Sequence, residues 1–314
     1  MKRRYVTVDV FTDRLFHGNP VAVVLDAVGL SASQMQDVAI EFNYSQTTFV
    51  LPAQQPDHSA QVRIFTPARE VPFAGHPNVG TAFALAQAMA ERNETLPQQF
   101  VFEEKAGLVP VSLLQEDRTI VGAELLAPEP LSRRGCATAS EAAACLSLAP
   151  DDIRVDTHPP QVLSVGLPFL VAELASRDAL HRCAPNRSGF DALLPFDGAH
   201  SVYAYVRATG DDAVTAEADI LSRMFTARLN EDPATGSATG ALAAMLADAS
   251  PMSDGEVGFR FLQGVDLGRP SLLGARVVKS GGTARSVHVG GRCVKAMQRL
   301  RFACYGPLAR VTTE

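Results

Sequence analysis

The sequence has few charged residues and no block of basic ones. Of its 314 residues, 28 are Lys or Arg and 34 are Asp or Glu, which gives a formal net charge of −6. Charged residues make up 20% and hydrophobic residues 46%, so the chain can bury a substantial core and is not a disordered polyampholyte. A mildly acidic chain without Lys/Arg blocks has no electrostatic footprint for nucleic acid or anionic membrane, and we expect neither as a partner.

Long apolar runs and a leader pattern are also missing. No apolar run reaches the roughly 18 residues that a membrane helix needs. The basic N-terminus is followed by Tyr5-Val6-Thr7-Val8-Asp9-Val10, which alternates like a strand and not like a signal peptide. The five scattered cysteines favour reduced thiols over a disulfide framework. They are Cys136, Cys145, Cys183, Cys293 and Cys304. We expect a cytoplasmic globular protein of two ordinary domains or one large one.

Common cofactor and nucleophile motifs are absent. There is no G-x-G-x-x-G, Walker loop, C-x-x-C or H-E-x-x-H, so dinucleotide, P-loop and zinc sites have no support. The segment Gly236-Ser237-Ala238-Thr239-Gly240 is out of register for a nucleophile elbow, because Thr235 stands where that motif needs glycine.

Hydrophobic periodicity predicts a sheet-rich chain with a few helices. Ser31 is expected to cap an amphipathic helix, and two Ala-rich helices, at 79–90 and about 236–247, are expected to be enclosed on most sides. A shorter helix is predicted at 140–148. Predicted strands cover residues 6–10, 21–25, 47–51, 62–65, 100–103, 109–113, 119–125, 161–165, 170–174, 202–207, 258–262, 275–278 and 286–289. The stretch Ala127-Pro128-Glu129-Pro130 is the best candidate linker.

An internal repeat joins the starts of the two Ala-rich helices. His76-Pro77-Asn78-Val79-Gly80-Thr81-Ala82 aligns without a gap on Asp232-Pro233-Ala234-Thr235-Gly236-Ser237-Ala238, at an offset of 156 residues. A weaker similarity relates Gly18-Asn19-Pro20 to Gly166-Leu167-Pro168. Two copies imply two similar domains with equivalent helix starts related by a pseudo-twofold axis.

These helix starts predict an anion site. Unpaired backbone N–H groups cluster at a helix N-terminus, where the helix dipole is positive. Small residues at Gly75, Gly80, Gly236 and Ser237 allow a carboxylate to approach the backbone closely. His76 and Asp232 are suited to proton handling or to holding ammonium and hydroxyl groups, although each is also an ordinary capping residue. No cysteine lies beside either helix start, which excludes a two-thiol racemase.

The chain resembles the PhzF (phenazine biosynthesis F-like) family. The resemblance rests on Pro72-Phe73-Ala74-Gly75-His76-Pro77 and Glu231-Asp232-Pro233-Ala234-Thr235-Gly236-Ser237-Ala238, with further matches at residues 11–23, 43–50 and 263–271. It implies a diaminopimelate-epimerase-like α/β (α+β) fold, with two pseudo-symmetric domains that each wrap a curled, mostly antiparallel sheet around a central helix. We place these domains at 1–127 and 128–314, with the final strand able to cross back to the first domain.

The resemblance also implies an activity. Family members are typically cofactor-free cytosolic homodimers, and the characterised reaction isomerises trans-2,3-dihydro-3-hydroxyanthranilate by moving a proton from C3 to C1. Carried over, His76 and Asp232 would assist proton transfer, while Ser45, Gly75, Gly236 and Ser237 would bind a small carboxylate-bearing substrate. The family's central acid/base is a glutamate in an Asn-Leu-Ser-Glu-Thr type segment, which here reads Asn43-Tyr44-Ser45-Gln46-Thr47.

Gln46 therefore occupies the position of the catalytic glutamate. An amide donates and accepts hydrogen bonds but does not shuttle a proton near neutral pH. Three explanations are open. The protein acts on another substrate with Asp232 or His76 as the base, or it is a binding or catalytically silent homologue, or the chain is a Glu→Gln variant of an active enzyme.

Overall fold

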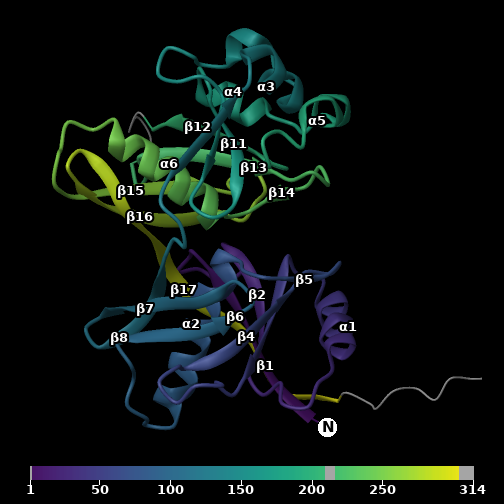
Figure 1. Cartoon of the computed structure of the whole chain (residues 1–314). Helices are drawn as coiled ribbons and strands as arrows, with labels where there is room; N and C mark the ends of the chain where they lie inside the picture. Colours follow the sequence, from purple (N-terminus) through teal and green to yellow (C-terminus); the bar gives the residue numbers. More distant parts are fainter. Residues whose placement is uncertain (1, 209–215, 304–314) are drawn as a thin grey trace, which may run out of the picture.

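The structure, a computed structural model, describes residues 2–208 and 216–303 and has two stacked lobes (Figure 1). Cys304 lies outside the described residues. The first lobe holds β1 (Lys2–Val10) to β8 (Thr119–Leu126), and the second holds β9 (Ser132–Cys136) to β16 (Ser271–Ser280). This is the sheet-rich, helix-poor architecture that the family resemblance implies. The predicted domain boundary at residue 127 stays a prediction.

The first lobe is a closed ring of strands. β1 pairs antiparallel with β2 (Asn19–Val24), which runs parallel to β3 (Gln46–Leu51); β3 pairs antiparallel with β4 (Ala60–Phe65). β4 runs parallel to β6 (Gln99–Glu104), and β7 (Gly107–Glu116) joins β6 to β8. The last described strand, β17 (Thr283–Ala303), pairs with both β8 and β1 and so closes the ring.

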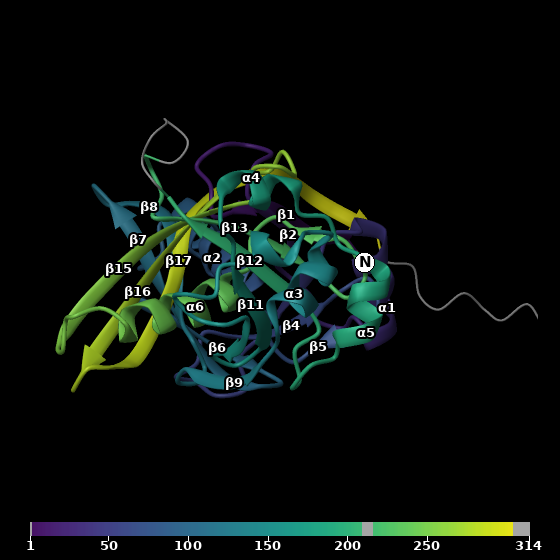
Figure 2. The ribbon, with the colours of Figure 1, turned by 90° about the horizontal axis from the view of Figure 1, so that it is seen from above.

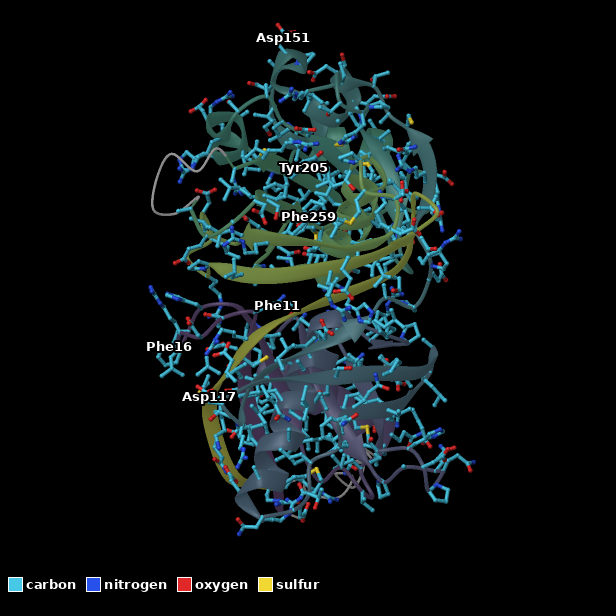
Figure 3. All side chains as sticks on the ribbon, turned by 90° about the vertical axis from the view of Figure 1, so that its left-hand side faces the viewer. Phe11, Phe16, Asp117, Asp151, Tyr205 and Phe259 are labelled. Atoms are coloured by element: carbon cyan, nitrogen blue, oxygen red, sulfur yellow. The ribbon has the colours of Figure 1, made fainter. Side chains whose placement is uncertain are left out.

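The second lobe repeats this order as far as β17. β9 pairs with β10 (Gln161–Ser164), then come β11 (Pro168–Glu173) and, parallel to it, β12 (Val202–Arg207). β13 (Ile220–Phe225) follows β12 and runs parallel to β15 (Gly255–Gln263), which pairs with β16. Seen from above, β15, β16 and β17 lie side by side (Figure 2). Figure 3 shows Phe11 where β17 passes from one lobe to the other.

The curled sheet of each lobe encloses one Ala-rich helix, as the sequence predicts. α2 (Gly75–Glu91) fills the first lobe, and α6 (Gly236–Asp248) fills the second, with every residue from Ala238 to Ala247 buried. Small side chains are needed because the sheet approaches the helix closely: a Cβ on Gly80 would lie 2.5 Å from Val21 Cγ1. α2 begins four residues earlier than predicted, because Pro77 is accommodated inside the first turn, where its missing N–H costs no intrahelical hydrogen bond.

The other described helices lie outside these two curled sheets. α1 (Ala32–Phe42) begins at the predicted cap, Ser31, whose hydroxyl accepts from Gln34 N in a capping box. The remaining helices cover the second lobe and are α3 (Ala139–Leu146), the 3₁₀ turn η1 (Pro150–Asp152), α4 (Arg177–Arg182) and α5 (Arg187–Leu193).

The two lobes repeat one another, but in a different register from the one that the sequence alignment suggests. β5 (Glu70–Val71) pairs with the end of β4 as β14 (Glu231–Asp232) pairs with the end of β13. Arg63 binds Glu70 and lies over Phe65; in the second lobe Arg223 binds Glu231 and lies over Phe225.

This pairing aligns Glu70 with Glu231, Gly75 with Gly236 and His76 with Ser237. The gapless match of His76 to Asp232 is therefore wrong by five residues, and the true counterpart of Asp232 is Val71. The error arose because Pro77 and Gly80 matched Pro233 and Gly236 by chance, whereas ladder hydrogen bonds fix the real register.

Candidate active site

The starts of α2 and α6 face each other between the lobes. An added Cβ on Gly75 would lie only 4.0 Å from the backbone nitrogen of Ser237. In the described part of the chain, neither N-cap residue, Ala74 or Thr235, makes a side-chain capping hydrogen bond to its helix. The first-turn N–H groups of two helices thus converge on one small region, which favours an anion there.

Asp232 lies beside the start of α6 in a polar cluster that spans both lobes. Its Oδ1 accepts from Asn19 Nδ2 of the first lobe at 3.0 Å, and its Oδ2 accepts from Thr235 Oγ1 at 2.6 Å. Asn19 also donates to the Ala234 carbonyl at 2.8 Å, and Ser45 Oγ donates to Asn19 Oδ1 at 3.3 Å. Asn19 therefore joins the predicted residues Ser45 and Asp232.

Burial raises the pKa of Asp232 to about 6, and the hydrogen bonds from Thr235 and Asn19 limit the rise. A carboxyl group with this pKa exchanges protons in the neutral range, as an acid/base catalyst must. The Asp232 carboxyl group thus has the protonation behaviour that the predicted role in proton transfer requires.

Gln263, at the end of β15, fixes the segment that carries Asp232. Its Nε2 donates to the Asp232 carbonyl at 2.8 Å, and its Oε1 accepts from Thr235 N at 3.1 Å. Sequence reasoning placed neither Asn19, Thr235 nor Gln263 in the site. All three lay in matched family segments, but the contacts of Asn19 and Gln263 to residues 232–235 join distant parts of the chain that no local pattern connects.

His76 is the second residue of α2 and is 7% exposed. Burial lowers its pKa to about 3 and outweighs the hydrogen bond to the Pro20 backbone, so the ring is neutral. Its Nε2 is buried and has no partner among the described residues. A neutral imidazole with an unpartnered ring nitrogen can accept a hydrogen bond from a bound molecule.

Gln46 begins β3, opposite Val21. Within the described ranges its Oε1 also lacks a hydrogen-bond partner although it is buried. Buried polar atoms are normally paired, and two unpaired ones at Gln46 and His76 are consistent with a polar ligand at this place. No hydrogen bond between described side chains directly joins Gln46, His76 and Asp232, although His76 bonds the Pro20 backbone and the neighbouring Asn19 bonds Asp232.

An apolar pocket adjoins the helix starts. Ser237 is the one polar residue among those lining it, which are Phe11, Phe73, Gly75, Leu125, Ala127, Pro128, Val165, Gly166, Leu167, Gly236, Ser237 and Val289. In the repeat, Leu167 of the second lobe corresponds to Asn19 of the first. The side of the paired helix starts that carries Asn19 is therefore polar, and the opposite side, which carries Leu167, is apolar. The pocket shares Gly75, Gly236 and Ser237 with the predicted site, whereas His76, Gln46 and Asp232 lie outside its lining.

Over residues 2–208 and 216–303, no three His, Cys, Asp or Glu side chains gather in a way that could hold a metal ion. In the same ranges no helix has the length and apolarity needed to cross a bilayer. The described cysteines are free thiols, and burial raises the pKa of Cys145 to about 11 and that of Cys183 and Cys293 to about 12.

A family model described as phenazine biosynthesis-like protein matches residues 8–299. The chain belongs to this PhzF family. It is 38% identical over 300 residues to an uncharacterized isomerase of Mesorhizobium japonicum, covering 93% of this chain and 96% of that protein. It is 37% identical over 291 residues to the trans-2,3-dihydro-3-hydroxyanthranilate isomerase of Pseudomonas aeruginosa, covering 92% and 95%.

The PhzF-family fold is shared with solved structures. A Bacillus anthracis phenazine biosynthesis protein of the PhzF family matches with a TM-score of 0.84 and 24% identity, over 97% of this chain and 100% of that one. A probable proline racemase of Agrobacterium radiobacter shares the fold as well, with a TM-score of 0.63 and 13% identity over 98% of this chain and 94% of that one. The fold is therefore the epimerase-like one that the resemblance implied, and the relatives named isomerases assign the chain to the isomerases.

Proposed function

We propose that this protein is a cofactor-independent isomerase that moves a proton within a small, cyclic carboxylate substrate of the trans-2,3-dihydro-3-hydroxyanthranilate type. The observation that carries the proposal is a buried carboxyl group, Asp232, with a pKa of about 6 beside two converging helix starts. The P. aeruginosa relative, named for isomerisation of that compound, supports the substrate type.

In the proposed reaction, the substrate carboxylate binds the first-turn N–H groups at Gly75, Gly236 and Ser237. Its ring lies against the apolar pocket, where Phe73 and Leu167 offer carbon surface. One C–H bond breaks, a proton passes to the enzyme, and a C–H bond forms at another ring carbon as the double bond moves. Because the enzyme returns the proton to the substrate, the substrate is neither oxidised nor reduced.

Because position 46 is an amide, another group must carry the proton. Its amide can orient a substrate amino or hydroxyl group but does not take up the proton. We assign the transfer to Asp232, and the neutral His76 ring would accept a hydrogen bond from the substrate. Losing a positioned general base typically lowers a rate by about 10²–10⁴-fold, so the assignment has a measurable consequence.

The test is solvent-deuterium incorporation into trans-2,3-dihydro-3-hydroxyanthranilate, followed by NMR. We expect incorporation by the wild type and strong loss in Asp232→Asn. Exchange that is absent in the wild type but robust in Gln46→Glu would show that the proton shuttle is missing from this chain, and would refute the assignment to Asp232.

The second candidate is a non-catalytic or altered-substrate binder on the same scaffold. The amide at position 46 favours it, because its unpaired oxygen can bind a ligand without proton transfer. It predicts that 3-hydroxyanthranilate raises the melting temperature while no candidate acid is turned over. His76→Ala and Asp232→Ala should then reduce the thermal shift, and an unchanged shift would place the ligand elsewhere.

A homodimer and a cytoplasmic location are further parts of the proposal and rest on the family resemblance alone. Light scattering after size-exclusion chromatography tests the dimer, for which a mass near twice 33.5 kDa is expected.

A further inference from the structure

Arg269 of the second lobe reaches across to the first lobe. It lies in the 264–270 loop between β15 and β16, and its Nη2 donates to Asp9 Oδ1 at 2.8 Å and to the His17 carbonyl at 2.7 Å. Its Nε donates to the Gly18 carbonyl at 2.8 Å. Asp9 is 3% exposed, and its other oxygen accepts from Phe16 N at 2.7 Å. One guanidinium thereby holds the loop between β1 and β2 at several points.

The loop between β1 and β2, residues 11–18, leads directly into Asn19. Gly18 N donates to the Pro270 carbonyl at 3.1 Å, so both backbone groups of Gly18 are bound by residues 269 and 270. Gly18 has φ +67, and a Cβ there would lie 2.3 Å from the Val10 carbonyl oxygen, so the loop conformation is narrowly defined. Figure 3 shows Phe11 and Phe16, which belong to this loop, beside the boundary between the lobes.

The N-terminal end of the 264–270 loop contacts the segment that carries Asp232. Gln263, immediately before the loop, donates to the Asp232 carbonyl. Gly264, with φ +75, is packed so tightly that a Cβ would lie 2.6 Å from both the Pro233 and the Arg269 carbonyl oxygens. Residues 263–270 thus contact the donor side and the acceptor side of the Asn19–Asp232 hydrogen bond at once.

We propose that Arg269 is a positioning residue that holds Asn19 of the first lobe in hydrogen-bonding contact with the Asp232 carboxylate of the second. Among the described residues, Arg269 makes its hydrogen bonds to Asp9, His17 and Gly18 and none to Asp232. Besides Asn19, the groups facing Asp232 are Thr235, which donates to it, and the charged Glu231 and the Tyr203 phenol. Because Asn19 donates to the charged form of Asp232, losing its alignment should make the carboxyl group hold its proton to higher pH.

The experiment is a ¹³C NMR titration of the Asp232 carboxyl carbon, assigned with Asp232→Asn, in the full-length protein without substrate. Loss of one hydrogen bond to a charged group should raise the midpoint by about one pH unit in Arg269→Met and in Asn19→Ala. The double variant should shift no further than Asn19→Ala alone, because both changes act through one contact. Arg269→Lys retains a charge near Asp9 but lacks the forked donors, and should give an intermediate midpoint.

Arg276→Met is the matched control. Arg276 also bridges the lobes, binding Glu124 and Glu256 at 2.8 Å each, but within the described ranges it makes no hydrogen bond or ion pair to residues 11–19. An unchanged midpoint in a folded Arg269→Met overturns the proposal, and so does an equal shift in Arg276→Met. If Arg269→Met does not fold, a wild-type midpoint in Arg269→Lys overturns it.

The inference rests on the proposed function only for its catalytic consequence. A shifted midpoint without isomerase activity in the wild type would refute the proposed function and leave the positioning role intact. Activity in the wild type with unshifted midpoints would refute the positioning role alone.

Discussion

Glu104 offers a direct test of how burial controls stability in the first lobe. It ends β6 beside the first turns of α2, and both its carboxylate oxygens are buried without a well-formed hydrogen bond to any described residue. Burial raises its pKa from 4.5 to about 8, and the Asn78 side chain offsets this only in part. The counterpart of Glu104 in the second lobe is Gln263, an amide that is fully hydrogen-bonded.

The perturbation is Glu104→Gln. Because the folded pKa lies above the unfolded one, the carboxyl group costs nothing at pH 4, and its penalty grows as the pH rises through 4.5 toward 8. At 1.36 kcal/mol per pKa unit, the penalty at pH 7 is up to about 3 kcal/mol. The neutral amide removes this penalty, so the variant should be more stable than the wild type at pH 7 and nearly equal to it at pH 4.

The assay is chemical denaturation followed by circular dichroism at pH 4, 5, 6, 7 and 8. The pH dependence contributed by Asp232 and other groups is shared by both proteins and cancels in the difference. Glu103→Gln is the matched control. The Glu103 carboxylate accepts from Gln54 N, Gln55 N and His58, which lowers its pKa, so that variant should lose stability at pH 7 relative to pH 4. A Glu104→Gln variant that is destabilised equally at every pH would refute the reasoning, because it would mean that the carboxylate makes favourable bonds.

Three further predictions concern the site and the folded backbone. If Asp232 is the base, the wild-type exchange rate should rise with pH with a midpoint near 6, and Asp232→Asn should lose about 10²–10⁴-fold of it; a flat profile from pH 5 to 7 contradicts this. Gly18→Ala should lower the free energy of unfolding by at least about 1–3 kcal/mol, because both its φ of +67 and the Val10 carbonyl oppose a Cβ. Gly282→Ala, at φ +80 with nothing within 4 Å, should cost less, and equal losses in denaturant titrations would argue against the clash. Ser31→Ala should cost about 1 kcal/mol through its lost cap, measured in the same way, and no loss would show that the capping box contributes little.

The central helices were the most predictable part of the fold. α6 matches its predicted range nearly residue for residue, because a helix enclosed by a sheet must be apolar and small on all sides, and few other structures need that composition. The β13 strand was not predicted. Its buried residues include the polar Ser222 and Arg223, which are hydrogen-bonded to Tyr203 and Glu231 on neighbouring strands. Because polar and apolar residues are buried together, the sequence of β13 lacks the alternation that predicts a strand.

The site was predictable where it depends on local backbone geometry. Gly75, Gly236 and Ser237 do meet, since helix starts rich in small residues are recognisable in sequence. The partners of Asp232 were not, because Asn19 lies 213 residues away along the chain and reaches it only through the packing of two lobes. The repeat register failed for a similar reason: pairing in the β-ladder, not residue identity, decides which residues are equivalent.

The closed ring of the first lobe has a consequence for synthesis of the protein. β1 and β8 are made early, yet the strand that joins them, β17, leaves the ribosome only after the whole second lobe. Until then both strands present open edges, which invite pairing with other chains. A chain terminated before Thr283 would keep those edges exposed, so the first lobe should need the last strand to become a soluble unit, and expression of residues 1–127 alone should yield aggregate.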